Sequence, residues 1–155
     1  MINGFATYRS EFGDIYEGEY KNGQFNGYGK YTSKSGDVCE GEYLNGLLHG
    51  KATCKYADGT TIIAEYKHGS PNGRGVSKIL TGDNYIGGFK DGLFEGSGIY
   101  EYANGDKHIG KFSKGLVHGK GKYIDGKTGA SVDGVWFNGE RLNDSKSQCN
   151  AAAPI

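Results

Sequence analysis

The chain has 155 residues, the length of one ordinary domain, and 29 of them are glycine. Glycine is therefore about 19% of the chain against about 7% in an average protein, and Leu, Ile, Val and Phe together also reach only about 19%. So few aliphatic residues would suggest disorder, but disorder also goes with high net charge, and here 18 basic and 18 acidic residues cancel. With 12 tyrosines and 7 phenylalanines as bulk, the composition favours an ordered repeat protein over a low-complexity chain.

The composition also bears on the compartment. No apolar run approaches the roughly 18 residues of a membrane-spanning helix, and the start of the chain resembles neither a signal peptide nor a myristoylation site. The 3 cysteines are irregularly spaced, which is typical of reduced thiols. These features predict a cytoplasmic protein.

A period of 23 residues runs through the chain. Aligned on Tyr16, the repeats are 16–38, 39–61, 62–84, 85–107 and 108–131, the last with one extra residue, between a half repeat at 1–15 and a partial repeat at 132–139. One array over 1–139 is therefore predicted, followed by a tail, 140–155, that is flexible or becomes ordered on a partner. An array that begins and stops within a repeat is expected to leave unpaired strand edges, which end-to-end association with itself or the tail would cover.

Each repeat is expected to form a β-hairpin. In YEGEYK (16–21) the alternation puts Tyr16, Gly18 and Tyr20 on one face, and the return strand puts Gly27, Gly29 and Tyr31 on the same face. The turns are predicted from Asn-Gly and Asp-Gly dipeptides, in which both residues tolerate positive φ, and from the dipeptides that align with them in the other repeats. They are Asn22-Gly23, Asn45-Gly46, His68-Gly69, Asp91-Gly92, Lys114-Gly115 and Asn138-Gly139.

The glycines are expected to lie opposite aromatic rings, which would recover apolar burial that glycine alone forfeits. The predicted register pairs Tyr20 with Gly29 and Gly18 with Tyr31. It recurs as Phe89 with Gly98, Gly87 with Tyr100, Phe112 with Gly121 and Gly110 with Tyr123. Because one hairpin is marginal in water, stability must come from stacking, which predicts an all-β, elongated, twisted single antiparallel ribbon or solenoid of stacked hairpins.

The segments YEGEYKNGQFNGYG (16–29) and YIGGFKDGLFEGSG (85–98) resemble the MORN repeat, approximately YxGxW/YxxGxxxGxGxxxxxxxG. The resemblance covers about residues 1–139 and implies the same hairpin stack. It further implies a binding or scaffolding module without chemistry of its own, of the kind found in cytoskeletal, ciliary and junctional membrane proteins and on some lipid kinases and methyltransferases. The repeat 62–84 departs most, with Ile62, Ala64 and Ser77 in place of Tyr, Gly and an aromatic residue.

No catalytic, metal or cofactor site is expected. The GxG tripeptides lack the following helix of a nucleotide-binding loop, and no acid or nucleophile recurs beside the four histidines, of which His49 and His118 share a column. Cys39 and Cys54 occupy the columns of Tyr16 and Tyr31 and are interpreted as buried substitutes for rings. A disulfide between them is possible in space but is not expected in a reducing compartment. Cys149 lies in the tail.

Three sets of residues are candidates for binding. The first is an aromatic groove that would hold an extended or helical peptide. The second is an outer apolar stripe, for which plain β-propensity is the alternative explanation. The third is an anion or lipid patch, for which a solvated strand face is the alternative. The groove comprises Tyr20, Tyr31, Tyr43, Tyr66, Phe89, Tyr100, Phe112, Tyr123 and Trp136; the stripe Ile63, Val76, Ile86, Ile99, Ile109 and Ile124; the patch Lys111, Lys114, Lys120, Lys122 and Lys127.

The sequence therefore predicts a non-enzymatic scaffold that binds protein partners, with the groove favoured over the stripe and with no nucleic acid partner. The resemblance suggests a cytoskeletal or ciliary setting. Two alternatives remain open: a peripheral membrane module that binds anionic phospholipid through the lysine-rich repeat 108–131, and a targeting or regulatory subunit of a larger enzyme.

Overall fold

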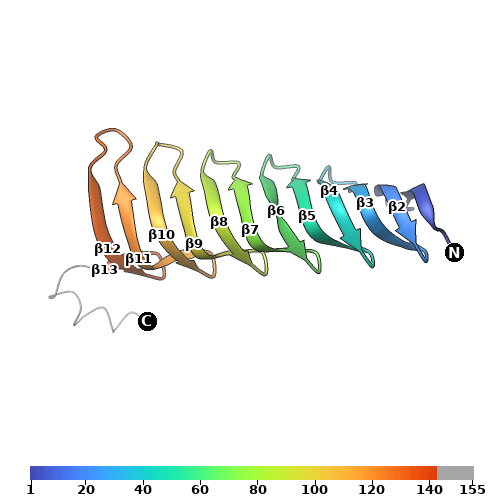
Figure 1. Ribbon diagram of the computed structural model, residues 1–155. Coiled ribbons are helices and arrows are strands. Elements are labelled where there is room, and N and C mark those ends of the chain that lie inside the picture. Colours follow the sequence, from blue (N-terminus) through green and yellow to red (C-terminus); the bar gives the residue numbers. More distant parts are fainter. Residues whose placement is uncertain (143–155) are drawn as a thin grey trace.

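A computed structural model describes residues 1–142, which form one antiparallel sheet of 13 strands and contain no helix. The strands are hydrogen-bonded in chain order, so the hairpins stack into an open ladder with the N-terminus at one end and β13 at the other (Figure 1). The predicted all-β ribbon of stacked hairpins is confirmed. The strands are β1 (Gly4–Arg9), β2 (Ile15–Lys21), β3 (Gln24–Thr32), β4 (Val38–Leu44), β5 (Leu47–Lys55), β6 (Thr61–Lys67), β7 (Ser70–Lys78), β8 (Asn84–Lys90), β9 (Leu93–Glu101), β10 (Lys107–Ser113), β11 (Leu116–Ile124), β12 (Ser131–Phe137) and β13 (Glu140–Leu142).

The ladder continues slightly beyond the predicted array. β13 pairs with β12 through Leu142, so the first residues of the predicted tail belong to the last hairpin. The rest of that tail, including Cys149, lies outside the described residues. Among residues 1–142 no helix is long and apolar enough to span a membrane.

The hairpin turns have the geometry that their sequences favour. Asn22 has φ +52° and Gly23 has φ +78°, the pair of positive values that a two-residue type I′ turn requires. All six turns repeat this pattern, including the two in which His68 and Lys114 take the first position at φ +50°. Each turn also bonds to the hairpin before it, as Gly46 N–H donates to the Phe25 carbonyl at 2.9 Å. The turns therefore set the stacking as well as the hairpin.

The register within the hairpins differs from the predicted one. Gly18 pairs with Gly29, Tyr16 with Tyr31 and Tyr20 with Phe25, so the predicted pairs Tyr20–Gly29 and Gly18–Tyr31 are wrong. The two-residue turn fixes Tyr20 opposite Phe25, and a bulge that adds two residues to the return strand then places the glycines opposite each other. The other four predicted pairs are wrong for the same reason. The observed pairs are Phe89–Phe94, Gly87–Gly98, Tyr85–Tyr100, Phe112–Val117, Gly110–Gly121 and His108–Tyr123.

This register joins two glycine columns into one row of glycine and alanine across the sheet. The row runs Ala6, Gly18, Gly29, Gly41, Ala52, Ala64, Gly75, Gly87, Gly98, Gly110, Gly121 and Gly134 in direct cross-strand pairs. The ring of Tyr16 lies against Gly29, where a Cβ would collide with it. The glycines therefore make room for rings that cover bare backbone, although the covering ring comes from a diagonal neighbour.

The core is a layer of rings on this face, called here the inner face. Tyr16 is fully buried, stacks on Phe25 with ring centroids 3.7 Å apart, and meets Tyr20 and Tyr43 edge-on. Its hydroxyl donates to the carbonyl of Glu19, the residue at the bulge, at 3.0 Å, so the ring also holds the bulge in place. Tyr85 repeats the arrangement, with Phe94 stacked at 3.8 Å and its hydroxyl bonded to the Gly88 carbonyl at 2.8 Å.

At the end of the strands opposite the hairpin turns, aspartates join successive repeats. Asp83 accepts the Tyr100 hydroxyl at 2.6 Å and the Ala103 N–H at 2.7 Å, both from the next repeat. Asp14 accepts the Tyr31 hydroxyl and the Lys34 N–H in the same way, and the backbone N–H of Lys34 is the main cause that lowers the Asp14 pKa. These carboxylates fix the loops of one repeat to the end of the previous one.

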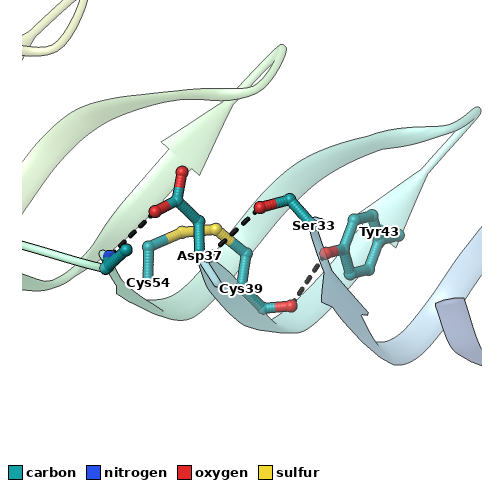
Figure 2. Close-up of a disulfide and its surroundings, with 6 residues drawn as sticks. Ser33, Asp37, Cys39, Tyr43 and Cys54 are labelled. Carbon is teal, nitrogen blue, oxygen red and sulfur yellow. Dashed lines mark hydrogen bonds between the residues drawn. A yellow bond between two sulfur atoms is a disulfide. The ribbon is translucent and has the colours of Figure 1, made fainter. Parts of the chain in front are cut away.

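One expectation about the cysteines is overturned. Cys39 and Cys54 face each other across β4 and β5, with Cα atoms 4.1 Å apart, and form a disulfide (Figure 2). The expectation of reduced thiols rested on the compartment, whereas the register places the two residues in direct cross-strand contact. Their columns are those of Tyr16 and Tyr31, which form the equivalent pair in the first complete repeat.

The third complete repeat, 62–84, keeps the common register despite its substitutions. β6 pairs with β7 with the same bulge, between Ala64 and Tyr66. The ring layer changes here, because Ile62 stands where Tyr16 and Tyr85 stand in their repeats. Ile62 packs against the ring cluster before it and the one after it, and so links the two parts of the core.

Candidate protein-binding surface

The predicted aromatic groove is largely part of the core. Six of its nine residues are only 4–7% exposed, and the other three are half-buried. The physical reason is that the rings cover one another: Tyr20 meets Phe25 edge-on, and Trp136 packs against His108. The six buried residues are Tyr20, Tyr43, Tyr66, Phe89, Phe112 and Trp136; the half-buried ones are Tyr31, Tyr100 and Tyr123, which donate their hydroxyls to Asp14, Asp83 and Asp106. The expectation that these rings line an open groove is therefore wrong.

The opposite, outer face carries most of the predicted apolar stripe in a single row. Ile63 pairs with Val76, Val76 with Ile86, Ile86 with Ile99 and Ile99 with Ile109, so five consecutive strands, β6 to β10, contribute one apolar side chain each. We call these five residues the isoleucine row. Ile63, Ile86 and Ile109 are 39–47% exposed, and Val76 and Ile99 are half-buried between them.

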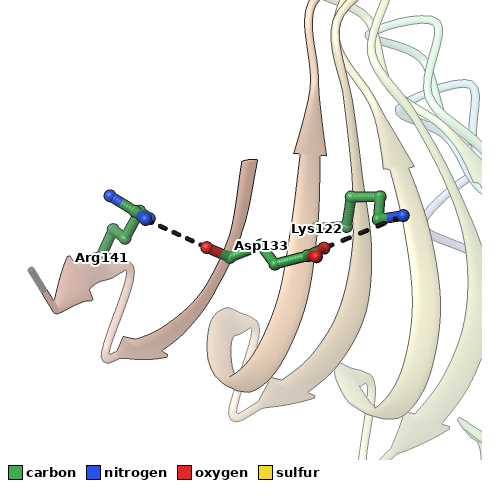
Figure 3. A network of polar contacts seen from close by, with 3 residues as sticks. All are labelled: Lys122, Asp133 and Arg141. Carbon is green, nitrogen blue, oxygen red and sulfur yellow. Dashed lines mark hydrogen bonds and ion pairs between the residues drawn. The ribbon is translucent and has the colours of Figure 1, made fainter. Parts of the chain in front are cut away.

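Ile124 does not belong to the isoleucine row. It pairs with Lys107 and Ser131, two positions away from the row along the strand, and is half-buried. The position next to Ile109 in the row is instead Lys122, which pairs with Asp133 across β11 and β12. The Lys122 ammonium lies 3.8 Å from the Asp133 carboxylate, and Arg141 donates to the Asp133 carbonyl at 3.0 Å (Figure 3). The apolar row therefore ends at a charged pair.

Beyond its other end the row continues in polar and charged residues. Continued toward the N-terminus, the same cross-strand positions are Thr53, Glu40, Lys30 and Glu17. Opposite charges face each other there, Glu17 opposite Lys30 and Lys30 opposite Glu40, which is the ordinary composition of a solvated strand face. The apolar segment is thus confined to the middle and later repeats.

The five predicted patch lysines do not form one patch. Lys111 and Lys120 lie on the outer face beside Ile109, and Lys122 is in the ion pair with Asp133. Lys114 is in a hairpin turn, where its N–H donates to Glu95 at 2.9 Å, and Lys127 is in the loop at the other end of the strands. Lys114 and Lys127 lie at opposite ends of the hairpin and therefore cannot join the lysines of the strands, as the predicted turn at Lys114-Gly115 already indicated for Lys114.

A shallow trough runs beside the isoleucine row. It has a volume of about 330 Å³ and lies between Ile86, Ile99 and Ile109 on one side and Arg74, Lys111 and Lys120 on the other. Gly98 and Gly110 of the glycine row form its floor, so bare backbone separates the apolar side from the basic side. Sequence reasoning missed Arg74, although its place between Gly73 and Gly75 matches that of Lys120 between Gly119 and Gly121.

Two of the four histidines, His108 and His118, make contacts that support the fold. His118 Nδ1 accepts the Asn138 N–H at 3.2 Å and so supports the next turn. His108 is 1% exposed and packs edge-on to Trp136 at 4.5 Å, in the position of Tyr16 and Tyr85. Its Nε2 has no hydrogen-bond partner, and burial lowers its pKa. Within residues 1–142 no group of three or more His, Cys, Asp or Glu side chains could hold a metal ion.

Comparison with known proteins identifies a matching repeat family. A model of the MORN repeat matches residues 16–38, 39–61, 85–107 and 108–127, more than half of the chain. It leaves out 62–84, the repeat that departs most in sequence but keeps the common register. No curated protein matches.

Among solved structures, the chain is similar to the SAS-4 (dCPAP) TCP domain, solved in complex with a proline-rich motif of Ana2 (dSTIL), of Drosophila melanogaster. The identity is 11% and the TM-score 0.39, over 85% of this chain and 84% of that one. MORN repeats are non-enzymatic modules that commonly mediate protein or membrane interactions. With four matched copies in an unbroken stack of hairpins, the chain belongs to the MORN repeat family.

Proposed function

We propose that this protein is a scaffold that binds a protein partner through the isoleucine row on its outer face. The observation that carries the proposal is the register of Ile63, Val76, Ile86, Ile99 and Ile109, one continuous apolar row between charged ends. Strand propensity alone would favour β-branched residues anywhere on the outer face, including the repeats where Glu17, Lys30 and Glu40 stand instead. A row of this kind marks an interaction site more often than isolated exposed residues do.

The test introduces a cross-strand residue pair that already occurs in another hairpin of this protein. Replacing Ile86 by Glu and Ile99 by Lys recreates the pair Glu17–Lys30 of the first complete hairpin, so the variant keeps a native cross-strand pair. The matched control changes another exposed apolar pair, Leu44→Lys with Leu47→Gln, which recreates Lys21–Gln24 near the turn.

Wild type and both variants are immobilised and exposed to an extract of the source cells, and the bound proteins are quantified by mass spectrometry. We expect at least one protein to bind wild type and the control but to be lost from the Ile86→Glu/Ile99→Lys variant. Equal capture by all three proteins would refute the isoleucine row as the docking site.

The lipid-binding hypothesis and the predictions about the cellular setting need separate tests. The lipid hypothesis relied on five lysines acting together, and only Lys111, Lys120 and Lys122 lie near one another beside the row. Sedimentation with anionic vesicles at physiological salt decides it, because a protein that stays in the supernatant does not bind the lipid. Whether the scaffold works in a cytoskeletal or ciliary assembly, associates end to end, or serves as a subunit of a larger enzyme stays a prediction, to be tested by cross-linking in cells.

A further inference from the structure

The trough beside the isoleucine row has two chemically different sides. Ile86, Ile99 and Ile109 supply aliphatic surface, and on the other side stand Arg74, Lys111 and Lys120, all three of them exposed. Among the described residues that line the trough, none is Asp or Glu. The basic side is therefore not neutralised by carboxylates within the trough itself.

The positions of the cations follow from the sheet. Arg74 pairs with Gly88, which has no side chain to cover the guanidinium. It lines both this trough and the neighbouring hollow beside Ile63, where Glu40 and Glu65 also stand. The Lys111 ammonium is oriented by a hydrogen bond to the Ser97 hydroxyl at 2.7 Å. Lys120 also lines the next hollow toward the C-terminal end, beside Val135. Basic groups thus accompany the row from β7 onward, whereas Glu65 stands beside Ile63 on β6.

The rest of the outer face shows that this charge is local. At the equivalent positions of the earlier repeats the side chains are Glu19, Tyr28, Glu42, Lys51 and Glu65, with Glu17, Lys30 and Glu40 in the line of the row. The chain as a whole has no net charge. The outer face is therefore acidic to neutral at its N-terminal part and basic beside apolar residues in its later part, a division that only the register reveals.

The dimensions favour a short linear segment. Five adjacent strands at about 4.8 Å spacing make the row about 19 Å long. That length accommodates about 6 residues of extended chain or about 13 residues of helix. A membrane would contact a broad protruding apolar surface, whereas this row is one side chain wide and lies beside a trough.

We propose that the trough binds an acidic peptide segment of the partner, whose apolar side chains lie on the isoleucine row while its Asp or Glu carboxylates pair with Arg74, Lys111 and Lys120. The inference rests on the proposed docking function and specifies the chemistry of its ligand. Charge pairs at an exposed rim contribute mainly specificity and association rate, and the apolar contacts supply most of the affinity. Charge complementarity then selects acidic over neutral apolar segments.

The experiment uses a random peptide library displayed on phage, with peptides of about 16 residues, long enough for either conformation. The full chain is the bait, and enriched peptides are synthesised for titration. We expect the enriched peptides to combine several Asp or Glu residues with Leu, Ile, Val or Phe. Their affinity should fall as salt concentration rises, because exposed charge pairs are screened.

Two variants separate the parts of the proposal. The triple variant Arg74→Glu, Lys111→Glu and Lys120→Glu should bind the enriched peptides about tenfold more weakly or worse, since like charges would face the carboxylates. Its matched control, Lys55→Glu, Lys67→Glu and Lys90→Glu, makes the same change in net charge at exposed positions outside the trough and should bind as wild type does.

The outcomes are distinguishable. Enriched peptides without excess Asp or Glu, or unchanged affinity in the triple variant, would overturn the acidic ligand. The docking function would still stand if the Ile86→Glu/Ile99→Lys variant failed to bind these peptides. Peptides that bind all variants equally would overturn both. Competition between the enriched peptides and vesicles of phosphatidylserine and phosphatidylcholine would assign the trough to a membrane and overturn the peptide.

Discussion

At the scale of single residues, the position of Tyr16 determines how well each repeat is packed. Tyr16 and Tyr85 fill it with a ring that lies on glycine backbone and a hydroxyl that donates to the bulge carbonyl. Burial raises the pKa of both to about 12, so the hydroxyls remain donors even above the ordinary tyrosine pKa of 10. Cys39, Ile62 and His108 fill the same position in other repeats. The column is visible in the sequence, but not that Tyr16, Tyr85 and His108 in it are at most 1% exposed.

His108 makes stability depend on pH. Burial without a partner for Nε2 disfavours the imidazolium, so the folded pKa lies below the unfolded value near 6.5. The unfolded chain then binds more protons between the two values, and stability falls as pH drops below about 6.5. Urea unfolding at neutral pH and near pH 5.5 should show this loss in wild type.

The substitution His108→Tyr should reduce that loss. By analogy with Tyr85 and Gly88, the new hydroxyl would reach the carbonyl of Lys111, which should add about 1–2 kcal/mol of stability at neutral pH. The same urea measurements check both effects. A variant that is less stable than wild type, or that keeps the full pH dependence, would contradict this view of the position.

At the scale of the element, the hairpin is defined by its turn, its bulge and its cross-strand pairs. The two-residue turn was predictable because Asn-Gly and Asp-Gly favour positive φ, and the structure has it at His68 and Lys114 too. The bulge was not predictable by pattern, since Gly27 and its equivalents could as well have been ordinary strand positions. Every error in the predicted register follows from that one feature.

The pair Cys39–Cys54 should make the stability of its hairpin sensitive to reducing agents. The disulfide closes a segment with a sequence separation of 15, for which the chain-entropy account gives about 3 kcal/mol. Oxidised protein should therefore unfold at a higher urea concentration than reduced protein, and its free energy of unfolding should be greater by about that amount. Non-reducing peptide mapping establishes that the bond is present, and the variant Cys39→Ala/Cys54→Ala, whose unfolding should be indifferent to reductant, is the control.

At the scale of the whole molecule, the protein is a row of nearly equivalent hairpins, each of which contacts its neighbours. Stability in such a stack is the sum of local units and their interfaces, so one unit can be removed if the phase of the repeat is kept. What distinguishes the units is their outer face, charged in the first hairpins and apolar with basic neighbours in the later ones. Binding should therefore depend on which repeat is removed, although folding should not.

Two deletions of 23 residues test this separation. Removing 85–107 deletes Ile86 and Ile99 and leaves Asp83 in phase to hold the next loop, whereas removing 39–61 leaves the isoleucine row whole. Both variants should keep the strand signal in circular dichroism and show a proportionally smaller denaturant m-value. Only the first should lose the partner captured by wild type. Loss of the folded state in both would contradict the additive view.

The repeat, its period, the turns and the all-β ladder were predictable from spacing along the chain, because glycine and aromatic columns at fixed intervals leave few other folds. The same spacing grouped Ile63, Val76, Ile86, Ile99 and Ile109 with Ile124, of which the structure places only Ile124 outside the row. Three features emerge only in the folded protein: most of the predicted groove rings are core, Cys39 meets Cys54, and Arg74 lines the same trough as Lys111 and Lys120. The physical reason is the register: a shift at the bulge changes which residues face each other, and neighbours across strands cannot be read from spacing along one chain.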